Sequence, residues 1–474
     1  MKNVFSKYKA YFYQFIRKTH KISIVGSGPS AFYTTQYILK NVTKINIDMY
    51  EKLPFPYGLV RYGVAPDHQS AKNVINKFDK LMKDDRFSFF GNISIGTDIH
   101  IKELQEAYDA VILCYGSFNK QHLNIPGEKL KGVHSAQEFV GWYNGHPDHS
   151  KFKTDLSCET AVIIGNGNVS LDIARILLSP IQSLKSTDIS EMAINVLAKH
   201  RPRHIYVLGR RGPLDASFTI QEFRKITHIP HCKLLLDPLD FDHILSEKFD
   251  DKNITRPKLR IKELLIQQLK ECVKEDYMPK NDATQKVLEF KFYLKPVLIY
   301  PKSESPCDNS EPIVGGIKLA PNRKSIIGES NCPSSEIDIK CGMIIKSIGF
   351  RGKDIDDTLK LVDPNVGTIP NIRGKINNHP GLYCSGWIKC GSIGDISSTM
   401  YDAFDTGETV INDIRKNPIS NKLGSDSIIP HLDAKNIKYY TSKDWTKFDQ
   451  MEKSIGLSKN KLREKLININ EYEK

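Results

Sequence analysis

The sequence lacks the cysteine spacing of three common kinds of site. Nine cysteines are scattered along 474 residues, and no two of them stand as Cys-x-x-Cys. This absence argues against a zinc ribbon, a ligated iron-sulfur cluster and a redox-active dithiol, and we expect no metal site. An odd number of scattered cysteines also fits a reducing compartment better than a secreted disulfide framework.

Long apolar runs are absent as well. The longest run, residues 110–115, has the length of a buried strand and falls far short of the ~18 residues that cross a bilayer. We therefore expect no transmembrane segment, so that any association with a membrane would be peripheral. The hydrophobic fraction of 40% and the charged fraction of 26% are those of a globular protein, and 474 residues suffice for two to four domains.

Acidic residues are missing from the start of the chain, where the first acid is Asp48. The first 21 residues contain six lysines and arginines, and aromatic residues recur at helical spacing from Phe5 to Phe15. Such a basic amphipathic segment resembles a mitochondrial transit peptide, which we place at residues 1–20; a frayed basic terminus is the alternative. The net charge of +13 is compatible with nucleic-acid binding. Without a zinc finger, an RNP-like aromatic signature or a long arginine run, we expect no nucleic-acid partner.

Two segments have the pattern of a strand, a glycine-rich turn, a helix and a second strand. The first has a strand at 22–25, a turn at 26–31, a helix at 32–39 and a strand at 45–50. The second has a strand at 161–164, a turn at 165–170, a helix at 171–178 and a strand at 204–208. Two such units predict an α/β protein with two Rossmann-like dinucleotide-binding domains.

The first turn has the fingerprint of a dinucleotide site. Gly26 permits a tight turn, Gly28 lets the backbone approach a pyrophosphate, and the following helix offers free N–H groups to the phosphates. Glu51, at the end of the second strand, would accept hydrogen bonds from a ribose and repel a 2′-phosphate. The turn is therefore expected to bind FAD or NAD rather than NADP. A purely structural glycine turn is the alternative.

The second turn is followed by the opposite charge. Where an acid would end the strand at 204–208, the chain has Arg210 and Arg211. Two guanidinium groups suit bidentate contact with a 2′-phosphate, which predicts NADP rather than NAD. A solvated arginine pair beside an ordinary turn is the alternative.

Further strands at 109–115 and 343–348 bracket the second unit, and each is followed by a glycine. The economical topology therefore inserts the second domain into the first. Residues 189–198 are expected to form an extra helix, and residues 301–335, rich in Ser, Pro, Asn and Lys, to form surface loops and hairpin connections.

Five longer motifs are distinctive. They are residues 51–68 (EKLPFPYGLVRYGVAPDH), 72–76 (KNVIN), 139–145 (FVGWYNG), 172–178 (DIARILL) and 382–387 (LYCSGW). Together they resemble the motifs of adrenodoxin reductases, the mitochondrial-type NADPH:ferredoxin oxidoreductases, and the similarity covers almost the whole chain after residue 20. The resemblance implies the glutathione-reductase-like plan, in which an FAD-binding domain at 21–119 and 345–474 is interrupted by an NADP-binding domain at 120–344.

The resemblance also implies particular cofactor contacts. FAD would be bound by Gly26, Gly28, Ser30, Glu51, Leu59, Ile95, Trp387, Gly394, Asp395 and Ile396. NADP(H) would be bound by Asn166, Gly167, Asn168, Val169, Arg210, Arg211, Glu222 and Gly394. Gly394 is shared because only a residue without Cβ lets flavin and nicotinamide stack closely.

Basic residues of the second domain match stretches that face an acidic [2Fe-2S] ferredoxin in the family. They are Arg224, Arg256, Lys258 and Arg260. Opposite charges speed encounter and orient the partners, with sensitivity to salt as the signature. A solvated helix face without a partner is the alternative.

Two further residues match the family and could act on protons. His68 and Asp172 each lie just after a cofactor segment, and a carboxylate beside an imidazole would raise the pKa of the histidine and support proton movement or domain coupling. A structural hydrogen bond is the alternative, so neither is assigned as catalytic.

Three residues depart from the family pattern. Cys390 stands where the family has Arg, Ser392 where it has Pro, and Asp395 where it has an apolar residue. An acid close to a flavin would oppose accumulation of the anionic reduced form and lower the flavin potential.

The resemblance implies an FAD-dependent NADPH:ferredoxin reductase that takes hydride from NADPH onto FAD and passes single electrons to an adrenodoxin-like [2Fe-2S] ferredoxin. We expect a monomer in the mitochondrial matrix or a mitochondrion-derived organelle. A flavoprotein of the same fold with a different acceptor, or a non-catalytic FAD/NADP-binding scaffold, are the alternatives.

Overall fold

The computed structural model describes residues 19–199, 201–246, 255–274, 285–302, 311–322, 336–416 and 420–469. The chain divides into two compact units. The first comprises Met1–Val64, His68–Gln121 and Gly349–Ser454, and the second Ala65–Asp67, His122–Ile348 and Ile455–Lys474. Within the described part of the chain, no helix is long and apolar enough to cross a membrane. Residues 1–18 of the expected transit peptide lie outside the described residues.

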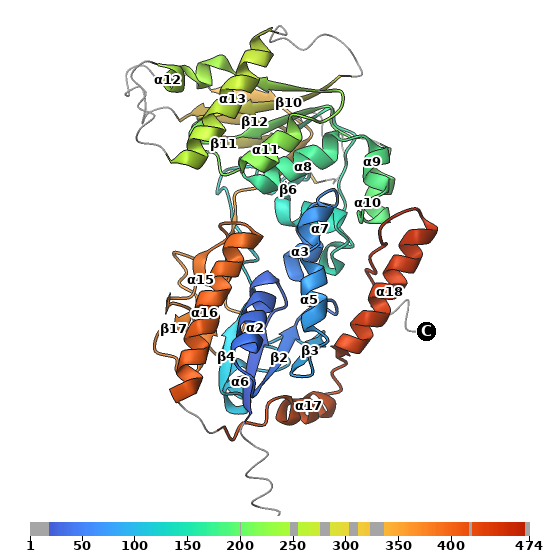
Figure 1. The fold of residues 1–474 in the computed structure, drawn as a ribbon. Coiled ribbons are helices and arrows are strands. Elements are labelled where there is room, and N and C mark those ends of the chain that lie inside the picture. Colours follow the sequence, from blue (N-terminus) through green and yellow to red (C-terminus); the bar gives the residue numbers. More distant parts are fainter. Residues whose placement is uncertain are drawn as a thin grey trace, which may run out of the picture. The chain divides into compact units, whose positions relative to one another are not determined.

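The first unit is built on an eight-stranded sheet in the order β16-β17-β18-β4-β1-β2-β3-β19 (Figure 1). Its five central strands are parallel: β18 (Leu382–Cys384), β4 (Ala110–Leu113), β1 (His20–Val25), β2 (Ile45–Glu51) and β3 (Phe87–Gly91). Short antiparallel strands complete the two edges: β16 (Asn371–Ile372), β17 (Lys375–Ile376) and β19 (Tyr440–Thr441). Central parallel strands need apolar residues on both faces, and all four residues of β4 are buried accordingly.

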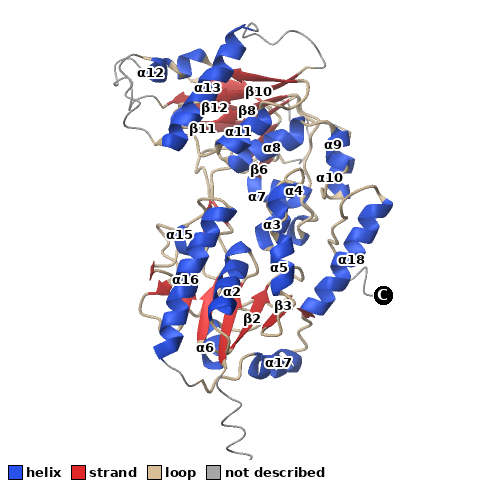
Figure 2. Ribbon diagram, viewed as in Figure 1, coloured by secondary structure: helices blue, strands red, loops and turns tan. Residues whose placement is uncertain are grey.

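Helices cover this sheet, as Figure 2 shows. They are α2 (Pro29–Asn41), α3 (Gly58–Tyr62), α4 (Gln69–Lys72), α5 (Ile75–Leu81), α6 (Ile101–Ala107), α15 (Trp387–Cys390), α16 (Ile396–Lys416), α17 (Ser425–Ala434) and α18 (Ser442–Ser458). Helices α2 and α16 pack side by side, and α6 and α17 share a buried cluster with β4 and β18. The paired strands β5 (Asn119–Lys120) and β15 (Phe350–Arg351) lie where the chain leaves this unit and where it returns.

Helix α18 holds α3 in place through a buried ion pair. Arg61 and Glu452 are both almost fully buried and form two hydrogen bonds, one of them 2.9 Å between Nη1 and Oε2. The Nε1 atom of Trp445, also on α18, donates to the hydroxyl of Tyr57 at 3.1 Å. These contacts matter for the site because α3 begins directly beside the first glycine turn.

The second unit contains a six-stranded, entirely parallel sheet in the order β6-β14-β7-β8-β10-β9. Its strands are β6 (Val133–Ser135), β14 (Met343–Lys346), β7 (Thr160–Ile164), β8 (His204–Leu208), β10 (Lys286–Lys291) and β9 (Cys232–Leu236). A separate antiparallel sheet contains β11 (Leu294–Pro301), β12 (Val314–Pro321) and β13 (Ile337–Lys340). The α-helices are α7 (Ala136–Tyr143), α8 (Asn168–Leu178), α9 (Ile181–Lys185), α10 (Glu191–Leu197), α11 (Ile220–Ile226), α12 (Asp242–Leu245) and α13 (Arg256–Lys274). Short 3-10 helices are Pro147–His149, Pro213–Asp215 and Pro238–Asp240.

Alternating side chains of β7 show how the two faces of this sheet are covered. Ala161 and Ile163 belong to the cluster that contains the helices, whereas Val162 and Ile164 pack with the antiparallel sheet. Successive strand residues point to opposite faces, so a continuous apolar run serves both layers. The α/β class predicted from the two glycine-turn segments is confirmed.

One local prediction was wrong in part, and residues 303–310 and 323–335 of its range lie outside the described residues. Residues 301–335 were expected to form surface loops and hairpin connections, but β12 lies within this range as the central strand of its sheet. Ile317 and Leu319 are fully buried there. The polar residues around β12 obscured a short apolar segment, which its packing on the parallel sheet stabilises as a strand.

Candidate functional site

The first glycine turn joins β1 to α2. Gly26 has φ of 98°. A Cβ added to it would lie 2.7 Å from the carbonyl oxygen of Cys114, the residue that follows β4. Gly28 is extended and immediately precedes α2, and no heavy atom lies within 4 Å of where its Cβ would be. The start of α2 has no side-chain cap, and open space adjoins its N-cap residue, an arrangement that fits a phosphate.

Glu51 lies against this turn, as the sequence predicted for a strand-end acid. One carboxylate oxygen accepts hydrogen bonds from the backbone N–H of Ser27 at 2.9 Å and from its hydroxyl at 2.6 Å. The other accepts from the N–H of Leu53 at 2.9 Å. Burial raises the pKa of Glu51, and the hydrogen bonds from Leu53 and Ser27 act against that shift. A carboxylate has about four acceptor positions, so these three bonds leave room for a ribose hydroxyl.

Two other expected FAD residues lie in different surroundings. Leu59, on α3, is 48% exposed, and its neighbour Gly58 packs so closely that an added Cβ would lie 3.0 Å from the Cα of Gly28. Ile95 is buried in the cluster shared with α6 and α17. Leu59 can offer its side chain to a ligand, whereas the buried side chain of Ile95 leaves only its backbone for contact.

A different turn, at Gly386 and Trp387, contacts the start of α2. Gly386 follows β18 with φ of 74°, and its added Cβ would lie 2.6 Å from Oγ of Ser30. The carbonyl oxygen of Trp387 accepts a hydrogen bond of 3.0 Å from the hydroxyl of Ser117. The structure thus brings Ser30 and the Gly386–Trp387 turn together, although they are distant in sequence.

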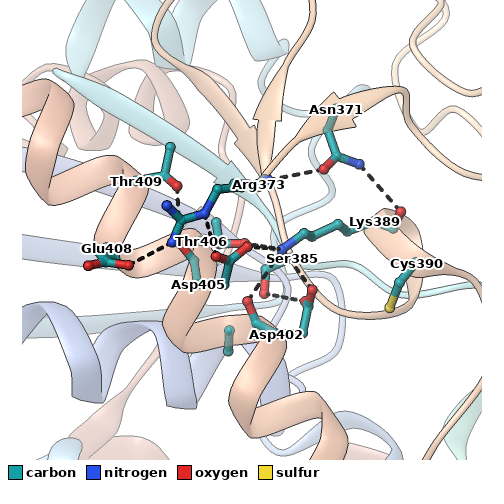
Figure 3. Close-up of polar contacts among 12 residues, drawn as sticks. Asn371, Arg373, Ser385, Lys389, Cys390, Asp402, Asp405, Thr406, Glu408 and Thr409 are labelled. Atoms are coloured by element: carbon teal, nitrogen blue, oxygen red, sulfur yellow. Dashed lines mark hydrogen bonds and ion pairs between the residues drawn. The ribbon is translucent and has the colours of Figure 1, made fainter.

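An ion-pair network fastens this turn to α16 (Figure 3). One Asp402 oxygen accepts from the N–H of Gly386 at 2.7 Å and from the hydroxyl of Ser385 at 3.3 Å, while the other pairs with Nζ of Lys389 at 2.7 Å. Lys389 also contacts Asp405 at 3.1 Å. Burial alone would lower the pKa of Lys389, but the two carboxylates raise it. The ammonium group is therefore held charged between them.

Sequence reasoning missed Asp402 and Lys389. Both are charged residues with little exposure, 17% and 10% for their side chains, but nothing local marks them as partners. The spacing of Asp402 and Asp405 on one face of a helix, with a lysine just after Trp387, is the signal that could have indicated them.

The second glycine turn, between β7 and α8, repeats the geometry of the first. Gly165 has φ of 114°, and its added Cβ would lie 2.1 Å from the carbonyl oxygen of Ser347. Gly167 is extended at the start of α8, and the nearest atom to its added Cβ is Cβ of Ser217 at 3.9 Å. Nδ2 of Asn166 is buried without a hydrogen-bond partner among the described residues. An open helix start beside a donor without an acceptor fits a phosphate-bearing nucleotide.

Four other expected NADP residues lie in or near this turn. Oδ1 of Asn168 accepts from the N–H of Thr219 at 2.8 Å, which ties the turn to the residue that caps α11. Val169 is partly buried against the helical core. Arg210 and Arg211 follow β8, and both side chains are exposed. The parallel pairing of β7 with β8 places the arginines at the same sheet edge as the turn.

Glu222 and Asp172 lie in a charged cluster around Arg175. The guanidinium group donates to Asp67 at 2.5 and 2.9 Å and to Asp172 at 2.8 Å, and its third nitrogen lies 3.7 Å from Glu222. Burial raises the pKa of Asp172 to about 7, against the attraction of Arg175. Arg175 is thus a partner of Asp172 that the sequence analysis missed, although the i, i+3 spacing of the two residues on α8 could have indicated it. His68 is assigned to the first unit, and its expected pairing with Asp172 stays a prediction.

The four expected docking cations lie on two neighbouring helices of the second unit. Arg224 is on α11, whereas Arg256, Lys258 and Arg260 are on α13, and all four are exposed. Helices α11 and α13 pack against each other. The structure therefore places these cations on two helices that pack together, and their role in docking stays a prediction.

Comparison with known proteins identifies the family. Mitochondrial NADPH:adrenodoxin oxidoreductase of Bos taurus is 41% identical over 459 residues, which cover 96% of this chain and 91% of that protein. The Arabidopsis thaliana protein of the same name is 36% identical over 465 residues, covering 94% and 93%. The chain belongs to the NADPH:adrenodoxin oxidoreductase family. No protein-family model matches it.

A solved structure supports this placement in the NADPH:adrenodoxin oxidoreductase family. FprA of Mycobacterium tuberculosis in complex with NADPH superposes with a TM-score of 0.85 at 34% identity, covering 96% of this chain and 98% of that one. Because the superposition covers nearly the full length of both proteins, both units of this chain are similar to FprA.

Two residues that depart from the NADPH:adrenodoxin oxidoreductase pattern have clear local roles. Asp395 caps α16: Oδ1 accepts from the N–H of Ser398 at 2.8 Å, and this backbone hydrogen bond lowers the pKa of Asp395. The hydroxyl of Ser398 accepts from the N–H of Asp395 in return, also at 2.8 Å. Ser392 donates to the carbonyl oxygen of Phe350 at 2.9 Å and accepts from its N–H at 3.3 Å. Hydrogen bonds hold the loop at Ser392, where a proline would restrict it through its ring.

The remaining residues near this helix start are Cys390, Gly394 and Ile396. Cys390 is exposed, and its thiol donates to the carbonyl oxygen of Gly386 at 3.3 Å. Partial burial raises the pKa of this thiol, so it is not activated as a nucleophile. Gly394 has φ of 91°, which favours glycine, and Ile396 begins α16. The proposed effect of Asp395 on the flavin potential stays a prediction.

Proposed function

We propose that this protein is a mitochondrial NADPH:ferredoxin reductase that binds FAD in its first unit and NADP(H) in its second. The observation that carries the proposal is the pair of glycine turns with matching geometry and opposite charge beside them. The acid at the first turn suits a free ribose, and the arginines at the second suit a 2′-phosphate. The names of the relatives, which specify NADPH, adrenodoxin and the mitochondrion, agree with this assignment.

Two features of the first unit fit a bound FAD. The open space at Gly28 lies where a pyrophosphate would meet the start of α2, and Glu51 is fixed beside it. Around the flavin, Ser30, Leu59, Ile95, Trp387, Gly394, Asp395 and Ile396 would complete the site. Asp402 and Lys389 would hold the Gly386–Trp387 turn at its place. These residues bind and orient the cofactor.

The second unit fits NADP(H) by the same reasoning. Asn166, Gly167, Asn168 and Val169 would bind the pyrophosphate, with the unpaired amide of Asn166 as one donor. Arg210 and Arg211 would bind the 2′-phosphate, and Glu222 and Gly394 would lie toward the nicotinamide portion. All of these residues except Gly394, which belongs to the first unit, lie in the part of the chain that would interrupt the FAD domain in sequence.

FAD, when bound, supplies the redox chemistry, because it accepts a hydride from NADPH and releases electrons one at a time. One NADPH and two oxidised ferredoxins give NADP⁺, one proton and two reduced ferredoxins. No side chain is required as a nucleophile, and His68 and Asp172 are retained only as candidates for proton movement or domain coupling. The acceptor would be an acidic [2Fe-2S] ferredoxin that docks on Arg224, Arg256, Lys258 and Arg260. We propose a monomer.

An anaerobic absorbance titration tests the proposal. NADPH is added to purified protein that lacks residues 1–18, with NADH in a parallel cell, followed by an oxidised [2Fe-2S] ferredoxin. We expect a bound flavin whose absorbance NADPH bleaches at far lower concentration than NADH, and whose colour ferredoxin restores. A flavin that is bleached but not restored would leave a same-fold reductase with another acceptor. A bound flavin that NADPH does not bleach would favour the non-catalytic scaffold alternative, and protein that retains no flavin would contradict the FAD assignment.

A further inference from the structure

The loop that bears Arg210 and Arg211 is held by residues of the antiparallel sheet. The carbonyl oxygen of Gly209 accepts from the N–H of Leu294 at 3.1 Å, and that of Arg211 accepts from the N–H of Tyr293 at 3.3 Å. Both donors lie where β11 begins. These two bonds use backbone N–H groups, which any residue except proline would supply at these positions.

The bond to the carbonyl oxygen of Arg210 differs because it comes from a side chain. Nδ2 of Asn322 donates to that oxygen at 2.6 Å. Asn322 directly follows β12, and its own N–H donates to the carbonyl oxygen of Tyr293 at 2.6 Å. The amide is thus fixed by the same hairpin that meets the other two carbonyls, and it is half-buried.

Packing fixes the far end of the loop. Tyr293 is 7% exposed, and a Cβ added to Gly212 would lie 2.2 Å from its hydroxyl oxygen. The carbonyl groups of Gly209, Arg210 and Arg211 are all hydrogen-bonded, and Gly212 packs on the ring of Tyr293. These contacts restrain the backbone conformation of the loop. The orientation of the peptide between Arg210 and Arg211 then sets the directions in which both arginine side chains leave the chain.

We propose that Asn322 is a positioning residue for nucleotide selectivity, which it exerts by holding the peptide that follows Arg210. The inference rests on the proposed function, in which the two arginines bind a 2′-phosphate. Arginine side chains lose much rotamer freedom when they bind a ligand, so a fixed backbone lowers the cost of bringing two guanidinium groups to one phosphate. Without the Asn322 amide, both arginines remain, but the backbone from which their side chains extend is less constrained.

The test measures the affinity of the full chain, with its flavin bound, for two fragments. One is 2′,5′-ADP, which carries the 2′-phosphate, and the other is 5′-AMP, which does not. We expect Asn322→Ala to bind 2′,5′-ADP about three- to tenfold more weakly, the size of one lost hydrogen bond, with 5′-AMP almost unchanged. Asn322→Leu, which is close in shape but has no donor, should show the same loss. Calorimetry gives both affinities.

Tyr300→Phe is the matched control. It removes the hydrogen bond of 2.6 Å from the Tyr300 hydroxyl to Asp338 on the same antiparallel sheet, without touching the arginine loop. A general loosening of the sheet would weaken both fragments in all three variants, whereas the proposal expects a change in the ratio for the Asn322 variants alone. Selectivity equal to that of the unmodified protein in both Asn322 variants would overturn the inference. An unmodified protein that binds both fragments equally would instead overturn the assignment of the arginine pair to a 2′-phosphate.

Discussion

The two glycine turns have the same backbone and different surroundings. In each turn the first glycine has a positive φ, and a Cβ added to it would clash with a backbone carbonyl at the end of a neighbouring strand. The second glycine is extended at a helix start, beside open space. Glu51 is hydrogen-bonded to the first turn itself, through Ser27. Arg210 and Arg211 belong to a loop held by the antiparallel sheet.

This difference separates two functions of such a turn. On the proposed function, the backbone at the glycines would bind phosphates in both units, and the residues after the neighbouring strand would decide which nucleotide is preferred. Because Glu51 shares hydrogen bonds with the first turn, a change there disturbs binding as a whole. The arginines of the second unit are bonded elsewhere, so their selectivity can be altered while the turn is left intact.

Substituting the glycines should have the largest effects. Gly26→Ala places a Cβ 2.7 Å from a backbone oxygen at a positive φ, and we expect a loss of about 3 kcal/mol in stability together with the flavin. Gly165→Ala, with a Cβ 2.1 Å from the Ser347 carbonyl, should be at least as damaging to the second unit. Thermal unfolding and flavin content measure both.

Gly28→Ala is the control for the first turn. Its backbone is extended and its Cβ meets no atom within 4 Å, so stability should stay near that of the unmodified protein while flavin binding is lost. Equal destabilisation by Gly26→Ala and Gly28→Ala would contradict the separation of turn geometry from the phosphate cradle.

Removing both arginines should have the next largest effect. Replacing Arg210 and Arg211 together with alanine is expected to weaken NADPH binding by at least about 100-fold, because each charged hydrogen bond contributes about 1.5 to 3 kcal/mol. Binding of NADH should change little. Arg351→Ala, at an exposed arginine of the first unit, serves as the control. An equal loss for both nucleotides would show that the pair does not read the 2′-phosphate.

Loss of the network behind the Gly386–Trp387 turn should have a smaller effect. Asp402→Ala removes the acceptor of the Gly386 N–H and one partner of Lys389, and we expect flavin affinity to fall about tenfold. Titration of flavin-free protein with FAD measures this. Asp413→Ala is a matched control on the same helix, since it also removes a lysine contact of 2.7 Å, here with Lys375. A similar loss in both variants would mean that the helix as a whole, rather than the turn, had been disturbed.

The smallest expected effect concerns pH. Burial raises the pKa of Asp172 to about 7 from 3.8, so the folded protein holds this proton more tightly than the unfolded chain does. Stability should therefore fall as pH rises from about 4 to 7, and Asp172→Asn should lessen that fall by about 1 kcal/mol between pH 6 and pH 7. Urea unfolding at the two pH values checks this.

Asp395 in the first unit should behave in the opposite way. The hydrogen bond from the Ser398 N–H lowers its pKa, so its contribution is present near neutral pH and is lost as pH falls through its folded pKa. Asp395→Asn should leave the slope between pH 5 and pH 8 unchanged. An identical change of slope in both variants would contradict the assigned shifts.

The sequence by itself determined the local parts of both turns. Gly26, Gly28, Gly165 and Gly167 stand between a strand and a helix, with the same spacing in each unit. Gly26 and Gly165 have a positive φ, which favours glycine, whereas Gly28 and Gly167 are extended at the helix start. Glu51 lies one residue after the strand expected at 45–50, and the arginine pair follows the strand at 204–208, so their positions at the sheet edge follow from strand direction alone.

Only the tertiary structure decided which distant residues support these turns. Asp402 reaches Gly386, Asn322 reaches Arg210, and Arg175 reaches Asp67. None of these pairings has a fixed sequence spacing, because each depends on how separate segments of chain pack.

The end of the chain shows the same limit. Residues 455–474 group with the second unit by their contacts, and Nζ of Lys465 pairs with Asp188 at 3.0 Å while Nζ of Lys461 donates to the carbonyl oxygen of Ile189 at 2.6 Å. Both lysine side chains are almost fully buried. From the sequence alone, a lysine is expected to be exposed and charged. These two lysines can be buried because the folded chain supplies a carboxylate and a carbonyl oxygen as their partners.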